Sequence, residues 1–345
     1  MKRNIRVILC GLGSYGQDMA RIIISKKTTE LVGVVTRSSH VGEDVGDVTG
    51  IDRKLGVIVS NDLDAVLSET KPDVMLDATA SHTREVYPHI MKALEANVHV
   101  ISMCEELANP WVHEPELAKK LDGTARKNKV SVVGTGMNPG FYLDVLPLTF
   151  AGACAEVRKI VVRRITDITH SVSTSPTIAR NFGIGLSIEE AKQRLAEGKI
   201  TLHVGLPETI HQLANAMGWR LTEIKEEREP VESSITLDYS PIVKVEPGTS
   251  CGCRYDGWGM VNGEVVIALE GKLVCEPNDT LEVEPFYTLW LEGKPNIRVD
   301  APAMVGPEHS IIVGARCCNW IPYIIKAKPG LLTNMNDFPL VTCLR

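Results

Sequence analysis

A short apolar run near the N-terminus leads directly into a glycine-rich turn and then into a helix-like segment. The run covers residues 5–9, the turn covers residues 11–16 (GLGSYG), and the helix-like segment covers residues 17–25. A G-x-G-x-x-G spacing between a strand and a helix is the fingerprint of a dinucleotide-binding fold, in which the backbone of the turn approaches the pyrophosphate. We therefore predict cofactor contacts from Gly11, Gly13, Ser14, Tyr15 and Gly16. The alternative is an ordinary glycine-rich turn between a strand and a helix.

Strands and helices are predicted to alternate over residues 1–140. Short apolar runs cover residues 5–9, 31–36, 57–59, 74–78, 99–102 and 130–134, and the amphipathic segments between them include 18–25, 83–96 and 114–128. This alternation is typical of βαβ units, which form a parallel sheet with helices on both faces and right-handed crossovers. Residues 1–140 are therefore predicted to form a dinucleotide-binding α/β domain of the Rossmann type.

The sequence pattern changes after Asn138-Pro139-Gly140. Longer β-type runs cover residues 157–168, 233–245, 257–269 and 280–291, and helix-like segments cover 187–197 and 207–218. Ser187, with Glu190 three residues later, forms a capping box at the start of the first of these helices. The pattern predicts a second, α+β domain over residues 141–306, with a mostly antiparallel sheet that serves substrate binding and oligomerisation. Residues 307–326 read as a helix, and we expect the segment of about 307–345 to pack back on the first domain.

Composition and charge exclude several classes of protein. The chain has 345 residues, 44% of them hydrophobic, which is enough for two domains with buried cores. The net charge of -6 and the lack of any basic run longer than two residues argue against a nucleic-acid partner. We find no signal peptide and no apolar run of transmembrane length, so we expect no membrane partner and a cytoplasmic location.

The nine cysteines are an odd number and contain no pair of C-x-x-C motifs. They are expected to be reduced and mostly buried, as in a cytoplasmic protein. A metal site at Cys251 and Cys253 is an alternative, but no second pair of ligands follows at zinc-like spacing, so we predict no metal.

The segment that follows the second predicted strand indicates which dinucleotide the fold binds. In NAD-binding folds an acidic residue about 20 positions after the fingerprint holds the ribose hydroxyl. Here that position is Thr36, followed by Arg37, Ser38 and Ser39, without a carboxylate. An arginine can bind a 2′-phosphate bidentately and serine hydroxyls can donate to it, so we predict that these four residues bind NADP. The alternative is that Arg37 is solvated and that NAD is also accepted.

Polar residues follow two further predicted strands, at the edge where ligands bind to open parallel sheets. After the fourth strand, small residues would let the backbone approach the nicotinamide ribose, and we predict cofactor contacts from Ala78, Thr79 and His82. Thr79 or Ser81 could equally cap the next helix. Asp77, at the end of that strand, could orient backbone amides or take part in the chemistry.

Two adjacent glutamates follow the strand at residues 99–102. A carboxylate at the mouth of the cleft can act as a general acid or base, particularly when burial raises its pKa towards neutrality. The alternative is that both acids begin the next helix and interact favourably with its dipole. Because adjacent side chains point in different directions, one can serve each purpose, and we assign catalysis to Glu105 and the helix start to Glu106.

Three residues are candidates for binding substrate. Asn138 lies in the glycine-rich segment 134–141, where close backbone approach to a ligand is possible, although the segment could simply be an interdomain hinge. Arg164 and His170 are predicted to lie on one face of a strand in the second domain, where they could hold a carboxylate. A solvated sheet face is the alternative for this pair.

Four segments of the chain resemble the 2,4-diaminopentanoate dehydrogenase family, which belongs with the native amine dehydrogenases and the dihydrodipicolinate reductase-like group. The segments are ILCGLG at residues 8–13, CEE at 104–106, GTGMNPGF at 134–141 and HVGLPETIHQLANAMGW at 203–219. The likeness covers essentially the full chain. The resemblance implies an NAD- or NADP-dependent oxidation of 2,4-diaminopentanoate to 2-amino-4-oxopentanoate and ammonia, with the active-site glutamate in the CEE segment, at Glu105.

A mechanism for this reaction follows from the predicted site. Hydride leaves the carbon that bears the amine, and the Glu105 carboxylate stabilises the resulting iminium ion and helps water to add to it. No lysine follows directly on the predicted strands at residues 74–78, 99–102 and 130–134, which disfavours a Schiff-base enzyme. A dihydrodipicolinate reductase-like enzyme, an amino-acid dehydrogenase and a non-catalytic NADP-sensing protein are the alternatives. We expect a homodimer that forms through the sheet of the second domain.

Overall fold

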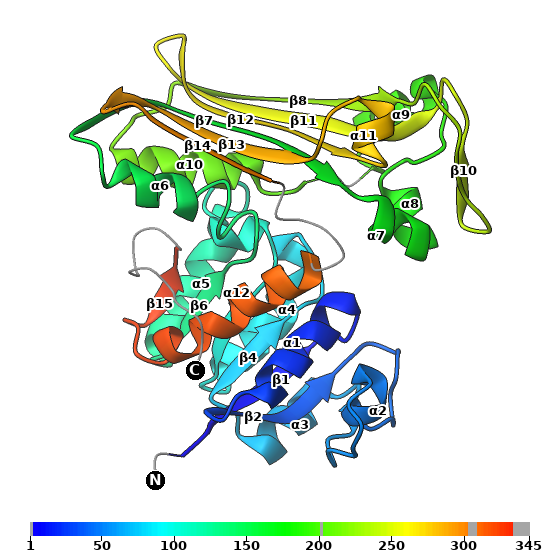
Figure 1. Ribbon diagram of the computed structural model, residues 1–345. Coiled ribbons are helices and arrows are strands. Elements are labelled where there is room, and N and C mark those ends of the chain that lie inside the picture. The colour runs from blue at the N-terminus through cyan, green and yellow to red at the C-terminus, as the bar shows by residue number, and fades with distance from the viewer. Residues whose placement is uncertain (1–2, 201–202, 303–308, 334–345) are drawn as a thin grey trace. The chain divides into compact units, whose positions relative to one another are not determined.

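The computed structural model describes residues 3–200, 203–302 and 309–333 of the chain (Figure 1). The chain divides into two compact units. The first unit combines Met1–Val145 with Ser310–Arg345, and the second unit covers Leu146–His309. The first unit is therefore discontinuous in sequence, because its C-terminal part returns after the second unit is complete.

The first unit is built around a parallel sheet of seven strands in the order β15-β6-β5-β4-β1-β2-β3. Its strands are β1 Ile5–Cys10, β2 Thr29–Val35, β3 Val59–Ser60, β4 Val74–Asp77, β5 His99–Ser102, β6 Ser131–Gly134 and β15 Gly330–Leu332. Its helices are α1 Ser14–Ser25, α2 Val45–Thr49, α3 Leu63–Thr70, α4 Thr83–Glu95, α5 Pro115–Lys127 and α12 His309–Ile324. The predicted Rossmann-type α/β fold is confirmed.

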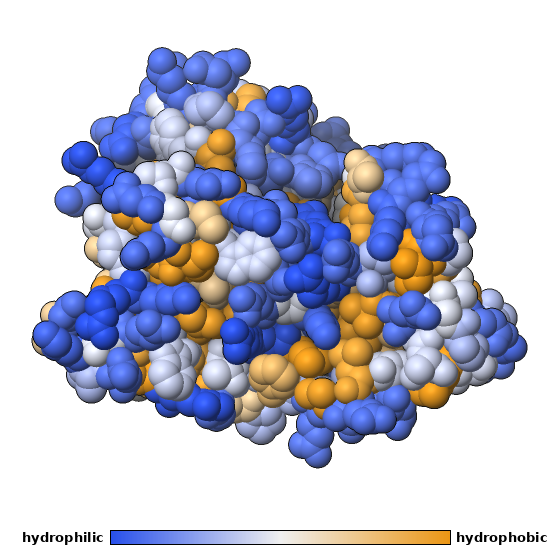
Figure 2. All heavy atoms as spheres, turned by 90° about the horizontal axis from the view of Figure 1, so that it is seen from above, coloured by the Kyte–Doolittle hydropathy of each residue, from blue (hydrophilic) through white to orange (hydrophobic). Residues whose placement is uncertain are grey.

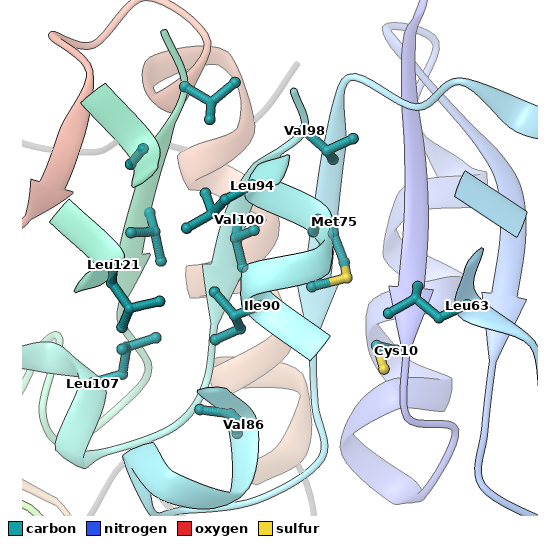
Figure 3. Close-up of a cluster of buried hydrophobic side chains, with 14 of the residues drawn as sticks. Cys10, Leu63, Met75, Val86, Ile90, Leu94, Val98, Val100, Leu107 and Leu121 are labelled. Carbon is teal, nitrogen blue, oxygen red and sulfur yellow. The ribbon is translucent and has the colours of Figure 1, made fainter. Parts of the chain in front are cut away.

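A cluster of buried apolar side chains joins this sheet to α3, α4 and α5 (Figure 3). Met75 and Val100 come from the strands, Ile90 and Leu94 from α4, and Leu121 from α5. Removing such side chains from water is the main favourable contribution to folding. The cluster therefore fixes the strands whose carboxyl ends carry the candidate site.

Helix α12 packs closely against α1, although the two are far apart in the sequence. A Cβ at Gly314 of α12 would lie 3.3 Å from Cγ of Met19 in α1, and Cys318 Sγ lies 3.8 Å from Met19 O. Strand β15 then pairs with β6 at the edge of the sheet. None of the helices in the described residues is long and apolar enough to cross a membrane.

The second unit contains a six-stranded sheet in the order β14-β13-β7-β12-β11-β8, and a separate pair, β10-β9. The strands are β7 Glu156–Asp167, β8 Glu223–Glu232, β9 Leu237–Tyr239, β10 Val243–Val245, β11 Ser250–Val261, β12 Glu264–Val274, β13 Phe286–Lys294 and β14 Ile297–Pro302. The helices are α6 Val145–Ala151, α7 Thr169–Thr174, α8 Pro176–Asn181, α9 Ile188–Ala196, α10 Leu206–Met217 and α11 Pro277–Thr280. Among the described strands of this sheet, only β7 and β12 pair in parallel, so the predicted mostly antiparallel α+β class is confirmed.

The two faces of the six-stranded sheet differ in their surroundings. On the inner face, the lack of side chains at Gly257 and Gly259 of β11 leaves room for Leu206 and Ile210 of α10. The outer face, away from α10, carries charged side chains that include Arg163, Glu270 and Lys225, and Trp290 on this face is 36% exposed. Figure 2, seen from above the view of Figure 1, shows a surface on which hydrophilic side chains predominate and hydrophobic ones are scattered between them.

Three strands predicted for the second unit are wrong in their bounds. The run 257–269 spans two strands, because Asn262 and Gly263 have φ values of 52° and 84° and form the hairpin turn between β11 and β12. The run 233–245 contains only the short strands β9 and β10, and the long strand β8 precedes it. The run 280–291 starts at the end of α11, and β14 and β15 have no counterpart in the prediction.

Ser187 caps α9 as predicted, since its Oγ accepts a hydrogen bond from Glu190 N at 3.2 Å. The Glu190 side chain instead accepts from Arg194 Nη2 at 2.6 Å, one turn further along the helix. The first half of the predicted capping box is therefore confirmed.

Candidate active site

The glycine-rich turn forms a tight junction between β1 and α1. Gly11 has a φ of +95° and a Cβ there would lie 2.6 Å from Ala78 O, while a Cβ at Gly16 would lie 2.1 Å from Gly11 O. Both positions therefore require glycine. A Cβ at Gly13 would meet nothing within 4 Å, and Gly13 begins α1 without a side-chain cap. The start of α1 thus turns the positive end of its dipole to open space, which fits a pyrophosphate.

The residues predicted to select NADP lie beside this turn. Gly11 N donates to Val35 O at 2.8 Å, which fixes the end of β2 next to the glycine-rich turn. Thr36 is buried, and its Oγ1 donates to Ser39 O at 2.5 Å, so it shapes the chain after β2. Arg37 and the two serines after it are exposed, and Arg37 makes no hydrogen bond or ion pair with the residues that the structure describes. Its guanidinium is therefore available to an anionic ligand.

Asp77, at the end of β4, is fully buried and hydrogen-bonded on both oxygens. Oδ1 accepts from Thr79 Oγ1 at 2.6 Å and lies 2.9 Å from His89 Nε2 of α4. Oδ2 accepts from Ser102 Oγ at 2.5 Å, and Ser102 Oγ in turn accepts from Cys104 N at 3.0 Å. This carboxyl therefore ties together the ends of β4 and β5, helix α4 and the start of the segment with the two glutamates.

Cys10 lies close to this network. One ligand atom each of Cys10, Asp77 and His89 lies within 4.8 Å of the others, as in a metal site. Both Asp77 oxygens already accept hydrogen bonds, however, and burial, together with the charge of Asp77, raises the pKa of Cys10 to about 12. A metal needs the thiolate, so the geometry favours a hydrogen-bonded network here.

The carboxyl of Glu106 caps helix α4. Its Oε1 lies 2.7 Å from His82 Nδ1, and its Oε2 accepts from the backbone N of Thr83 at 2.8 Å. Neither Thr79 nor Ser81 provides the cap, because the residue before the helix is His82 and it makes no side-chain cap. Glu106 begins the short 3-10 helix η1 Glu106–Ala108, so its predicted place at a helix start is confirmed. Its carboxyl in addition caps the preceding helix α4, where its charge favours the dipole.

Glu105 has different surroundings, although it is adjacent in sequence. Its Oε2 is buried and has no hydrogen-bond partner among the described residues. Burial raises the pKa of Glu105 to about 7, against the opposing effects of a hydrogen bond with Ser81 and the nearby His82. Burial and then the charge of Glu105 raise the pKa of Tyr15, so Glu105 lies near the glycine-rich turn. Such a carboxyl can exchange protons with a ligand near neutral pH.

The glycine-rich segment 134–141 is a compact loop. A Cβ at Gly134 would lie 2.3 Å from Ala108 N, and Gly140 has a φ of +129°. Asn138 Oδ1 accepts from Leu143 N at 3.1 Å, whereas its Nδ2 is buried and has no partner among the described residues. The side-chain amide therefore retains a donor for a ligand.

Two residues absent from the sequence prediction hold this loop. Asp144 is fully buried and accepts from Gly140 N at 2.8 Å. Arg316 of α12 donates from Nε to Gly140 O at 2.8 Å, and its guanidinium lies 5.5 Å from the centre of the Phe141 ring. Arg316 and Gly140 are 176 residues apart, so no local pattern pairs them. Asp144 lies just after the Asn-Pro-Gly motif, a position that could have drawn attention to it.

The prediction that Arg164 and His170 share a strand face is wrong. Strand β7 ends at Asp167, whose Oδ1 accepts from Thr169 N at 2.8 Å as the chain turns into α7. His170 is an exposed residue of that short helix. Arg164 is buried in the sheet, where its Nε donates to Tyr255 Oη, so a solvated sheet face is excluded for this residue.

The fold and the site of the first unit define a class of enzyme. A Rossmann-type sheet, a glycine turn that leaves room for a pyrophosphate, and a nearby glutamate with a buried carboxylate oxygen are typical of dehydrogenases with a nicotinamide dinucleotide cofactor. The family model for the 2,4-diaminopentanoate dehydrogenase C-terminal domain matches residues 141–345, and that for the dihydrodipicolinate reductase N-terminus matches residues 5–103. The chain belongs to the 2,4-diaminopentanoate dehydrogenase family, and the predicted family is confirmed.

Individual relatives agree with this assignment. The 2,4-diaminopentanoate dehydrogenase of Acetoanaerobium sticklandii is 36% identical over 341 residues, which cover 98% of this chain and 94% of the relative. The amine dehydrogenase of Streptomyces virginiae is 26% identical, with 97% and 96% covered. The solved structure of an amine dehydrogenase from Mycobacterium smegmatis has a TM-score of 0.84 at 22% identity and covers 99% of this chain and 97% of its own, which supports the same fold.

We expect Gly13→Ala and Gly16→Ala to separate cofactor binding from folding. Gly13→Ala should weaken dinucleotide binding about tenfold but lower the free energy of unfolding by less than about 1 kcal/mol, because the added methyl meets open space. Gly16→Ala should lower the free energy of unfolding by about 2 kcal/mol or more, because its Cβ overlaps Gly11 O. Urea unfolding and cofactor titration measure both effects. An equal loss of stability in the two variants would contradict this account of the turn.

Proposed function

We propose that this protein catalyses the NAD(P)-dependent oxidative deamination of 2,4-diaminopentanoate at C4, giving 2-amino-4-oxopentanoate and ammonia. The observation that carries the proposal is the buried Glu105 Oε2, which lacks a hydrogen-bond partner among the described residues, on a carboxyl whose pKa is raised to about 7 near the glycine-rich turn. The substrate is that of the Acetoanaerobium sticklandii relative, a 2,4-diaminopentanoate dehydrogenase.

The first unit would hold the cofactor at the carboxyl ends of its strands. In this proposal Gly11, Gly13 and the start of α1 at Ser14 contact the pyrophosphate, and Ala78 and Thr79 border the nicotinamide ribose. Further proposed contacts come from Tyr15, Gly16 and His82. When bound, the nicotinamide supplies the acceptor for the hydride that leaves the carbon bearing the amine.

Glu105 has two tasks in the proposed reaction. Loss of hydride from a neutral amine leaves a cationic C=N bond on the substrate, which the carboxylate stabilises. The carboxylate then takes a proton from the water that adds to this carbon, and it returns protons to the nitrogen, which leaves as ammonium. Amine, water and oxidised cofactor thereby become ketone, ammonium and reduced cofactor, and the reverse reaction is reductive amination.

The family assignment does not favour the alternative functions. A dihydrodipicolinate reductase-like enzyme matches the first part of the chain, but residues 141–345 match the 2,4-diaminopentanoate dehydrogenase model. A non-catalytic NADP-sensing protein would have no need of a half-buried carboxyl whose pKa is raised to about 7. The cytoplasmic location stays a prediction, supported by the free thiols of the cysteines in the described residues.

The proposed cofactor preference is for NADP, with NAD also accepted. Arg37, Ser38 and Ser39 are exposed beside the end of β2. The buried Thr36 holds this segment through the hydrogen bond from its Oγ1 to Ser39 O. Their donors suit a 2′-phosphate.

The proposed assembly is a homodimer through the outer face of the six-stranded sheet. Trp258 of β11 lies on this face with Lys225 Nζ 5.7 Å from its ring centre and Glu270 accepting from its Nε1 at 3.3 Å. Arg163 Nε donates to the same glutamate at 2.7 Å. Alternating charges of both signs around tryptophans can complement a second copy of the same face.

Arg37→Ala should weaken NADP binding about tenfold or more, because it removes a charged donor to the 2′-phosphate. NAD affinity should change less than about twofold, since NAD has no such phosphate. Dissociation constants for both cofactors, measured by fluorescence titration, provide the comparison. An equal loss of affinity for NADP and NAD would mean that Arg37 supports the loop and does not bind the 2′-phosphate.

Trp290→Glu should convert the dimer to a monomer, because it removes an exposed aromatic side chain from the proposed contact and adds a charge in its place. Trp111→Glu is the matched control, since Trp111 is also exposed but lies in the first unit. Sedimentation equilibrium gives the mass of each variant. A wild-type protein that is monomeric at micromolar concentration would contradict the proposed dimer.

Glu105→Gln should lower the rate of deamination by about 1,000-fold and leave the cofactor dissociation constant within about twofold. The wild-type rate should fall about tenfold per pH unit below about pH 7, because the pKa of Glu105 is raised and protonation removes the base. Initial rates are followed by the absorbance of reduced nicotinamide. Glu106→Gln is the control: loss of the α4 cap should lower the melting temperature, with a smaller effect on the rate.

A further inference from the structure

The second unit contains a buried arginine without a carboxylate partner. Arg164 of β7 is 5% exposed, its Nε donates to Tyr255 Oη, and its Nη1 is buried without a hydrogen-bond partner in the part of the chain that the structure describes. No ion pair joins Arg164 to any residue that the structure describes. A buried guanidinium without an anion is costly, so an anionic ligand is the natural complement to this side chain.

The strand register places Tyr255 beside Arg164 on the inner face of the sheet. Arg164 lies opposite Gly271 of β12, and Gly271 lies opposite Tyr255 of β11. A Cβ at Gly271 would lie 2.5 Å from Tyr255 Oη, so the glycine lets the tyrosine reach across β12 to the arginine. His203 stacks on the Tyr255 ring, with centres 4.6 Å apart and an angle of 14° between planes. The tyrosine is thereby held in position.

Neighbouring donors also lack acceptors. Thr166 follows Arg164 on the same face of β7, is 3% exposed, and its Oγ1 is buried without a partner in the described residues. Tyr255 Oη accepts from Arg164, which leaves its own proton to donate. A cation and two hydroxyl donors form a set that accepts an anion with several oxygens.

We propose that Arg164, Thr166 and Tyr255 bind the carboxylate of an amino-acid substrate. This inference rests on the proposed function and refines it, because it makes the carboxylate a requirement in addition to the amine that reacts. A planar carboxylate suits a guanidinium, which can donate two parallel hydrogen bonds to it. The cluster thus distinguishes a diamino acid from an amine that has no carboxylate.

The test compares two substrates that differ only in the carboxylate, 2,4-diaminopentanoate and butane-1,3-diamine. The wild-type protein should prefer the diamino acid by about 100-fold or more in kcat/KM. Arg164→Met should lower kcat/KM for the diamino acid about 100-fold and change that for the diamine less than about threefold. Thr166→Val should cost about tenfold, for the diamino acid alone.

Arg158→Met is the matched control. Arg158 is an arginine of the same strand β7, but it is exposed and pairs with Glu156, so neither substrate should be affected. Melting temperature and cofactor affinity show that each variant is folded. A readout apart from turnover is calorimetric binding of 2-aminopentanoate, which keeps the carboxylate without the reacting amine and should bind the wild type but not Arg164→Met.

The possible failures are distinguishable. If the wild-type protein oxidises neither amine, the proposed function fails. If it oxidises both and Arg164→Met lowers both equally, or if 2-aminopentanoate binds Arg164→Met normally, the carboxylate site is overturned and the function stands. If Arg164→Met and Thr166→Val weaken the cofactor instead, the anion recognised is a phosphate and the assignment is wrong.

Discussion

The buried carboxyl of Asp77 is the interaction on which the first unit's site depends. It connects the ends of β4 and β5 through Ser102, and it contacts His89 of α4. Hydrogen bonds to a charged, buried acceptor are strong, and leaving such a charge unsatisfied is costly. Asp77 is the last residue of β4, where the hydrogen bonds between sheet strands end. Its bond to Ser102, which accepts from Cys104 N, therefore fixes where the segment that carries Glu105 begins.

This support allows two adjacent glutamates to have opposite roles. Glu106 is stabilised by the start of α4, whereas Glu105 retains a buried oxygen without a partner in the described residues. A rise in pKa from 4.5 to about 7 means that ionised Glu105 destabilises the fold by about 3 kcal/mol above pH 7, an effect that vanishes below about pH 4. Glu106 contributes to stability, and Glu105 is available for chemistry.

The sequence predicted what depends on local pattern. The glycine turn, the strand at residues 99–102 and the placement of Glu105 at its end follow from spacing alone. What it missed depends on distant partners or on turns. Arg316 reaches Gly140 across 176 residues, and strand β15 joins the sheet from the other end of the chain. His170 was misplaced because a strand pattern continues past Asp167, where side-chain bonds to Thr169 turn the chain.

Glu105 and Arg164 share a physical property that separates the charges proposed to bind ligands from the structural charges in this protein. Asp77 and Glu106 are buried or half-buried and fully hydrogen-bonded, so they stabilise the unit in which they lie. Glu105 and Arg164 each keep an atom out of water without a partner in the described residues. Folding does not satisfy these atoms, so ligands that supply the missing partners bind the folded state selectively and stabilise it. A buried charged side chain that keeps an atom without a partner in the described residues therefore indicates a ligand site more directly than a sequence motif does.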